Sequence, residues 1–186
     1  MTSEDAVKFV SKACTDLGVP YMVVGSVSSM FYGVARLTVD ADFVVELGRD
    51  QLAALAKRLE SRLRLQPQPK LESVTFTTRY LFEEVDGNFS VELFALSEDD
   101  FDQERFRRRV EVHFADENVW LPTPEDVIVM KLRWYHHAQR TKDREDVSGI
   151  IAVRKSELDW GYIHRWCEIH GSREHLDAIR ESLKRL

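Results

Sequence analysis

Hydrophobic residues in the first third of the chain change from helical to extended spacing and back. Apolar positions three or four residues apart predict a helix over residues 4–17, which Gly18 would end. A short apolar run predicts a strand at 21–24. We expect three further elements of this alternating kind: a short helix at 26–33, a strand at 38–46, and a helix at 50–63 capped by Asp50.

The middle of the chain is rich in Val, Thr, Phe and Tyr, the residues that favour strands. Three strands are expected here, with the hairpin signal Asp86-Gly87 before the last of them: 71–78, 79–85 and 89–96. Two shorter segments, 110–114 and 119–121, alternate apolar and polar residues around a polar turn. This alternation is typical of strands with one solvated face.

The pattern becomes helical from Thr123 onward. Thr123-Pro124-Glu125-Asp126 combines a capping hydroxyl, a proline in the first turn and acids that interact well with the helix dipole. A second helix start lies at 156–159, and a last helix follows Gly171. The sequence therefore predicts an α+β fold: a mixed sheet flanked by helices at 1–122, and a C-terminal helical bundle at 123–186 that packs on it as one compact unit.

Composition restricts the functions that this chain can have. The 186 residues are 44% hydrophobic, which suffices for a real core, and the formal charge of −6 disfavours a protein that coats nucleic acid. The arginine-rich stretch at 105–109 is either a solvated edge of a strand or helix or a guide for an RNA acceptor, and the net negative charge favours the solvated edge. Two distant cysteines, no apolar run of about 20 residues and an acidic N-terminal stretch lead us to expect a soluble cytoplasmic protein without a membrane span.

Candidate chemistry gathers around the first predicted turn and the strand after it. Gly25-Ser26 precedes a helix, where free N–H groups and a hydroxyl can hold a phosphate. Asp40 and Asp42 share one face of the next strand, roughly 7 Å apart by strand rise. This spacing suits two carboxylates that bind the same hard cation. Paired acids and a phosphate-binding turn indicate metal-dependent chemistry on a nucleotide.

Val24-Gly25-Ser26 followed by Asp40-Ala41-Asp42-Phe43 resembles the signature of the DNA polymerase β-type nucleotidyltransferase superfamily. The resemblance implies three catalytic, metal-binding acids, and Glu92 in a later strand is our candidate for the third beside Asp40 and Asp42. It also implies Mg²⁺ or Mn²⁺ as cofactor and a nucleoside triphosphate as substrate. Arg36 and Thr38 match the "R-x-T-x-D-h-D" wording of small bacterial members, and we expect both to assist nucleotide binding together with Gly25 and Ser26.

A second resemblance covers the start of the helical region. The stretch from Leu121 to Leu132, followed by the stretch from Arg140 to Asp146, is similar to the tail of the AbiEii-type nucleotidyltransferases, a toxin-like group associated with abortive phage infection. This resemblance implies that Lys131 and Lys142 contact the nucleotide and that Asp143 and Asp146 hold the basic residues in place.

The function expected from these motifs is transfer of a nucleoside monophosphate to an acceptor hydroxyl, on an RNA or tRNA end or on a protein. The resemblance also implies a toxin with a cognate antitoxin as partner. Two alternatives stay open at this stage. One is a catalytically inactive nucleotide-binding or interaction module of the same fold. The other is an antibiotic nucleotidyltransferase, whose acidic acceptor pocket would use Glu83, Glu84 or Asp86.

Overall fold

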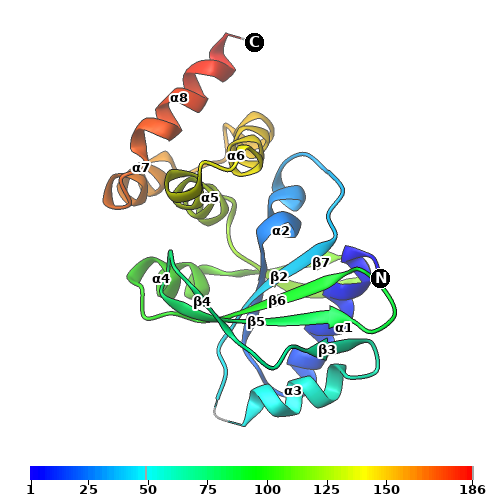
Figure 1. The fold of residues 1–186 in the computed structure, drawn as a ribbon. Coiled ribbons are helices and arrows are strands. Elements are labelled where there is room, and N and C mark those ends of the chain that lie inside the picture. The colour runs from blue at the N-terminus through cyan, green and yellow to red at the C-terminus, as the bar shows by residue number, and fades with distance from the viewer. Residues whose placement is uncertain (49, 186) are drawn as a thin grey trace. The chain divides into compact units, whose positions relative to one another are not determined.

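The computed structural model describes residues 1–48 and 50–185, which divide into two compact units. The first unit comprises residues 1–27 and 37–122, and the second comprises 28–36 and 123–186. Most elements of the first unit are labelled in Figure 1. Their bounds are α1 Ser3–Asp16, β1 Tyr21–Val24, β2 Asp40–Val45, α3 Gln51–Leu59, β3 Leu63–Leu65, β4 Lys70–Glu72, β5 Thr77–Glu84, β6 Ser90–Ala95, α4 Asp100–Arg108, β7 Val110–Phe114 and β8 Glu117–Leu121. Helix α2, Gly25–Tyr32, begins in the first unit and ends in the second.

A six-stranded mixed sheet forms the centre of the first unit. Its order is β1-β2-β6-β5-β3, and β4 pairs with the other end of the same edge of β5. Strands β2 and β6 are parallel, whereas the other pairs are antiparallel. A separate hairpin, β7-β8, makes a two-stranded sheet. The parallel pair aligns the beginning of β2 with the beginning of β6.

The two faces of the main sheet differ in burial. Phe43, Phe82, Val91 and Leu93 share one face and are fully buried. Helices α1 and α3 cover that face, with Leu55 and Leu59 among the buried residues of α3 (Figure 1). The other face is apolar only in part: an apolar cluster joins its strands to α4 and β8 and contains Met22, Val24, Val44, Phe94, Leu96, Phe106 and Trp120. The rest of this second face carries charged side chains.

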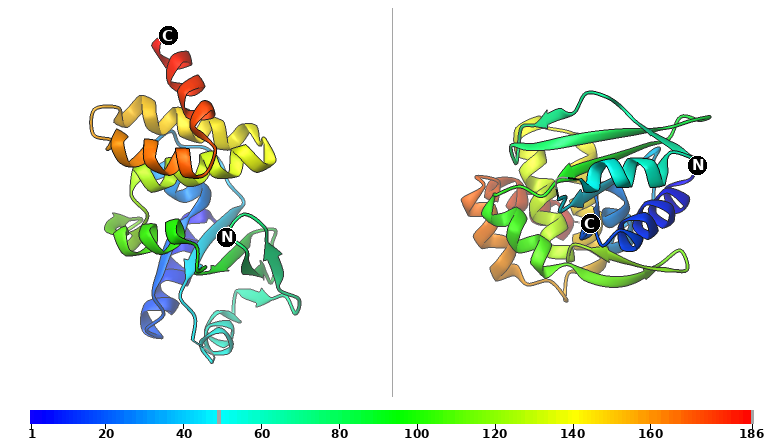
Figure 2. Two further views of the ribbon diagram at one scale, coloured as in Figure 1. Left: turned by 90° about the vertical axis from the view of Figure 1, so that its left-hand side faces the viewer. Right: turned by 90° about the horizontal axis from the view of Figure 1, so that it is seen from below.

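The second unit is a bundle of four helices that the end of α2 joins. Its helices, also shown in Figure 2, are α5 Pro124–Ala138, α6 Thr141–Arg154, α7 Trp160–Ile169 and α8 Arg173–Lys184. Thr123 caps α5 as predicted, since its hydroxyl accepts from the Asp126 N–H at 3.4 Å. Gly33 allows the end of α2 to approach α6, because a Cβ there would lie 3.0 Å from the Ile150 nitrogen. None of the described helices is both long and apolar enough to cross a membrane.

The predicted fold class is confirmed, and most predicted elements lie within a few residues of their expected positions. Helix α3 ends at Leu59 rather than 63, because Leu63 turns into β3, and Asp50 makes no capping hydrogen bond there. Residues 28–36 belong to the helical unit, whereas a single boundary at 122 would place them in the first unit.

The sequence pattern did not predict β3, α4 or the start of a separate helix at α6, and α4 is the longest segment that it left without an element. Asp99 caps α4, and Phe101 and Phe106 bury its apolar side. The interpretation of 105–109 as a solvated edge is wrong for Arg105, which is buried and whose Nε lies 2.6 Å from Asp102 Oδ1. A buried arginine with a carboxylate partner is a structural element of this helix and is not available to guide a nucleic acid.

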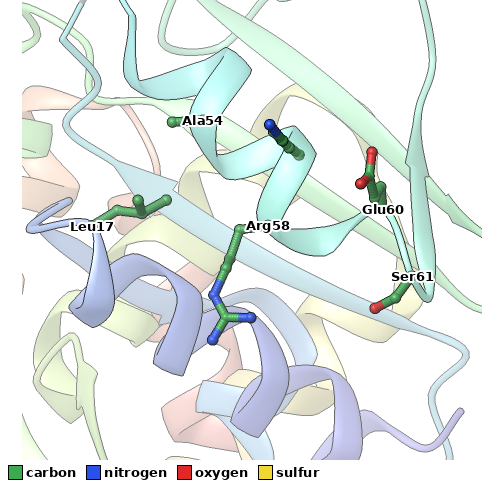
Figure 3. A pocket seen from close by; sticks show the side chains of 6 residues that line it. Leu17, Ala54, Arg58, Glu60 and Ser61 are labelled. Atoms are coloured by element: carbon green, nitrogen blue, oxygen red, sulfur yellow. The ribbon is translucent and has the colours of Figure 1, made fainter.

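A shallow cavity of about 520 Å³ lies where the end of α1 meets α3. Figure 3 shows Arg58 reaching from α3 toward α1, where its Nη2 lies 3.0 Å from Asp16 Oδ2. The cavity is lined by Leu17, Ala54, Lys57, Arg58, Glu60 and Ser61, none of which is a predicted site residue. The helices that form it cover the sheet face opposite to the charged one, so this cavity does not belong to the predicted site.

Candidate active site

Gly25 makes the turn from β1 into α2 directly beside Asp42. The antiparallel register pairs Val24 with Asp42, and Gly25 follows with φ +63°, a conformation that residues with a Cβ rarely adopt. A Cβ at this position would lie 2.8 Å from the Asp42 Cγ and closer still to Oδ2. Glycine is therefore required twice here, for the backbone angle and for the space that the carboxylate occupies. Ser26 follows as the second residue of α2 and is buried.

The parallel register of β2 and β6 brings the three predicted acids to one sheet face. Asp40 lies opposite Ser90, and Asp42 lies opposite Glu92. Residues at alternate positions of a strand share a face, and directly paired residues do as well. Asp40, Asp42 and Glu92, which we call the acid cluster, thus point to the same side, and each is half-buried. Thr38 donates its hydroxyl hydrogen to Asp40 Oδ1 at 2.5 Å and so orients the first acid.

Arg79 holds Glu92 and was not among the predicted site residues. Its Nη1 lies 3.0 Å from Glu92 Oε1 and 2.9 Å from Oε2, and the two side chains are 30% and 24% exposed. Register explains the contact, since Arg79 pairs with Phe94 and Leu81 pairs with Glu92 in the β5-β6 hairpin, which makes the two charges diagonal neighbours. The sequence does place Arg79 within a predicted strand, where a charged side chain indicates a solvated or paired position. That its partner is Glu92 follows only from the register of β5 and β6.

The donor set of the acid cluster fits a hard divalent cation. Three carboxylates share one face, and hard cations prefer oxygen ligands. Among the described residues, no group of three or more His, Cys, Asp or Glu side chains converges closely enough to hold a metal ion. Mg²⁺ is commonly held by one or two carboxylates together with water and substrate phosphates, so Asp40 and Asp42 suffice as its protein ligands.

Four of the five predicted nucleotide-binding residues of the second unit form a chain of alternating charges with Arg140, which was not among the predicted site residues. Lys131 is its centre, with Nζ 3.2 Å from Asp143 Oδ1 and 2.7 Å from Asp146 Oδ2. Arg140 donates from Nε to Asp143 at 2.7 Å, and Arg36 donates from Nε to Asp146 at 3.1 Å. We call these five residues the charged network. Lys142 lies outside it and is exposed on the first turn of α6.

Burial and partners act in opposite directions on Asp146. Burial alone would raise the pKa of its carboxyl group, but the hydrogen bond from Arg36 and the charge of Lys131 outweigh burial and hold the pKa below its usual value. A carboxyl group whose pKa is lowered on folding stabilises the fold above its unfolded pKa. This contribution is lost as the pH falls through the folded-state pKa. The Asp146 carboxyl group is therefore ionised at neutral pH.

Gly25→Ala should destabilise the protein by about 3 kcal/mol, since the left-handed backbone costs about 1–2 kcal/mol and the overlap with Asp42 adds a similar amount. Gly18→Ala is the matched control, because Gly18 has φ +62° and its Cβ would meet no atom within 4 Å. That variant should lose only about 1 kcal/mol. Urea unfolding of both variants measures the difference. Equal losses would show that Asp42 does not restrict position 25.

The fold is the one found in solved nucleotidyltransferases. Over residues 4–180 the chain matches the family described as "Nucleotidyltransferase of unknown function (DUF6036)", and it belongs to that family. A comparison with curated proteins gave no match. The superfamily prediction is thus confirmed, whereas the closer resemblance to the AbiEii-type group stays a prediction.

Solved structures share the fold at low sequence identity. An antigenic nucleotidyltransferase-like protein from Paracoccidioides brasiliensis is similar with TM-score 0.55 and 15% identity, over 95% of this chain and 91% of that one. ANT(2'')-Ia, solved with adenylyl-2''-tobramycin, gives TM-score 0.65 and 14% identity over 92% and 98% of the two chains. The lincomycin-bound lincosamide antibiotic adenylyltransferase LnuA is similar with TM-score 0.56 and 10% identity, over 82% of this chain and 98% of that one.

Proposed function

We propose that this protein is a metal-dependent nucleotidyltransferase that transfers a nucleoside monophosphate from a nucleoside triphosphate to an acceptor hydroxyl. The observation that carries the proposal is the acid cluster: Asp42 lies opposite Glu92, shares its face with Asp40, and has its carboxylate against Gly25. Carboxylates in the middle of a sheet are unfavourable without a cationic partner. Their place beside a phosphate-binding turn favours phosphoryl chemistry over a structural role.

In the proposed reaction, the acceptor oxygen attacks the α-phosphorus, the bond from that phosphorus to the β-phosphate oxygen breaks, and pyrophosphate leaves. Asp40 and Asp42 would hold Mg²⁺ or Mn²⁺, which when bound supplies charge for the triphosphate and lowers the pKa of the attacking hydroxyl. Thr38 would keep Asp40 oriented. Asp42 or Glu92 would accept the hydroxyl proton. Ser26 and the N–H groups at the start of α2 would bind phosphate oxygens.

The charged network of the second unit is proposed to bind nucleotide phosphates. Two aspartates take two of the three N–H donors of Lys131, so in this proposal the arginines of the network are the main contacts to a ligand. Arg36 and Arg140 are only partly buried and can bind phosphate while Asp146 and Asp143 hold them. In this proposal Lys131 acts mainly by placing the two aspartates, and exposed Lys142 stays a predicted contact.

A labelling experiment tests the proposed function. Each α-³²P-labelled nucleoside triphosphate is incubated with the protein, Mg²⁺ or Mn²⁺, and one of three acceptor pools: total RNA, lysate protein, or a panel of aminoglycosides and lincosamides. We expect label in a discrete product of one pool, and none with Asp40→Ala or Asp42→Ala. If calorimetry shows that nucleotide and Mg²⁺ bind but no pool yields pyrophosphate, the protein is the inactive binding module.

The charge of the first unit favours the antibiotic pool as a second candidate. This unit contains 21 acidic and 13 basic residues, a formal charge of −8, which opposes an RNA acceptor and attracts a cationic one. Glu83 is exposed and pairs with Ser90, so it lies on the face of the acid cluster. Glu84 points to the other face and binds the Met1 ammonium at 2.7 Å, so it does not serve such a pocket. Two of the similar structures point the same way: ANT(2'')-Ia was solved with adenylyl-2''-tobramycin, and LnuA is named a lincosamide antibiotic adenylyltransferase.

The toxin role and a cognate antitoxin remain proposals that rest on the sequence resemblance of residues 124–146. Purification of the protein with its genomic neighbour, followed by loss of the labelled product in the complex, would support both.

A further inference from the structure

Trp134 of α5 and Arg140, the residue before α6, form a stacked pair within the second unit. Helix α5 ends at Ala138, and Gln139 follows in the left-handed conformation with φ +51°, so only two residues join α5 to α6. This short turn places the Arg140 guanidinium carbon 4.7 Å from the centre of the Trp134 ring. At this distance the guanidinium packs against the indole and gains a cation–π interaction.

A buried carboxylate also holds Arg140. Its Nε lies 2.7 Å from Asp143 Oδ2, and the Asp143 side chain is 0% exposed and accepts from Lys131 through Oδ1. The two terminal nitrogens of Arg140 make no hydrogen bond or ion pair with any residue that the structure describes. Arg140 is therefore fixed at Nε and at the indole, while its side chain is 40% exposed and its terminal nitrogens can reach a ligand.

A second stacked pair in the bundle provides a comparison. The Arg180 guanidinium carbon lies 4.2 Å from the centre of the Trp160 ring, but its Nη1 lies 2.9 Å from His164 Nε2. A terminal nitrogen of that arginine thus already has a protein partner. The pair of Trp134 and Arg140 differs because its arginine keeps both terminal nitrogens available and belongs to the charged network.

We propose that Trp134 and Arg140 form the surface on which the base of the nucleoside triphosphate stacks. This inference rests on the proposed function, in which the charged network binds the phosphates, and deepens it by placing the base. Bases stack on aromatic rings and on guanidinium planes, and a base is only one ribose away from phosphates that Arg140 would bind. The charge of Arg140 repels a cationic acceptor, so the anionic nucleotide is the substrate that fits this pair.

The test compares ligands with and without a base. ATP, GTP, CTP, UTP and tripolyphosphate are titrated separately into the full chain at fixed free Mg²⁺, and calorimetry gives each affinity. Wild type should bind at least one nucleotide about ten-fold more tightly than tripolyphosphate, because stacking adds to phosphate binding. Trp134→Ala should remove most of this preference, whereas Trp134→Phe keeps an aromatic ring and should retain it.

Tripolyphosphate reports in the same variants whether the charged network is still in place. Asp143 still holds Arg140 in Trp134→Ala, so the affinity for tripolyphosphate should stay within about three-fold of wild type. Arg140→Lys is a second variant, which keeps the positive charge but loses the planar guanidinium. It should lose the preference for the nucleotide more than it loses tripolyphosphate binding.

Trp160→Ala is the matched control, because it removes the same side chain from the other stacked pair of the bundle. Nucleotide and tripolyphosphate should both bind within about three-fold of wild type. An equal loss of preference in Trp160→Ala and Trp134→Ala would overturn the inference, since the effect would then not depend on the position of the indole.

Other results would overturn the inference while leaving phosphate binding intact. One is a wild type that binds every nucleotide no better than tripolyphosphate, and another is a preference that survives Trp134→Ala. Equal losses of both ligands in Trp134→Ala would show that Trp134 only supports the charged network. If wild type binds neither nucleotide nor tripolyphosphate, the proposed function fails together with this inference.

Discussion

Asp42→Asn should lower the rate of nucleotidyl transfer by about 10³-fold or more, which corresponds to about 4 kcal/mol of lost transition-state stabilisation. Asp42 lies between the other acids and the predicted phosphate-binding turn, since it is paired with Glu92 in the sheet and its carboxylate lies next to Gly25. The amide keeps the shape of the side chain but removes one negative charge from the cation site. The measurement is single-turnover transfer of the labelled nucleotide at saturating Mg²⁺, together with Mn²⁺ binding.

Stability separates a catalytic role of Asp42 from a structural one. Loss of its charge relieves repulsion within the acid cluster, so the free energy of unfolding should stay within about 1 kcal/mol of wild type or rise. Asp116→Asn is the control, because the Asp116 side chain is 94% exposed and the chemical change is the same. It should leave rate and stability unchanged. An Asp42→Asn protein that retains a tenth of the activity, or that unfolds far more easily, would contradict the assignment.

Lys131→Met should destabilise the protein by about 3 kcal/mol. The Lys131 side chain is 9% exposed and its partners Asp143 and Asp146 are 0% and 5% exposed, so removal of the ammonium leaves two buried carboxylates facing a shared space. Arg140 and Arg36 still hold one carboxylate each, which keeps the loss near the lower end for a broken buried pair. Urea unfolding at pH 7 measures the effect.

Lys142→Met provides the comparison for Lys131→Met, since the same substitution is made eleven residues away at an exposed position outside the network. Its expected change is within about 0.5 kcal/mol. If the two methionine variants unfold alike, the buried lysine does not organise the charged network, and its direct contact with a nucleotide becomes the better account of its position.

The sheet register decides which features of the site could be foreseen. Asp40 and Asp42 could be placed on one face from strand spacing alone, because alternation is a property of two residues on the same strand. Their alignment with Glu92 was a prediction from resemblance, and it depends on β2 and β6 being parallel and in register. Arg79 could not be assigned to Glu92, because a register shift of one residue would have placed it on the other face.

Local chemistry in the chain was enough for most of the element types, the Thr123 cap and the need for glycine before α2. These features depend on residues within about four positions of one another, whose spacing and capping groups act whatever the rest of the fold does. Long-range packing alone decided the pairing of Arg79 with Glu92, the inclusion of 28–36 in the helical unit and the burial of Arg105. Helix α4 belongs with these, since its polar sequence becomes a buried helix only where Phe101 and Phe106 find an apolar surface to pack against. Contacts of this kind depend on where distant segments meet, and that is a property of the folded chain.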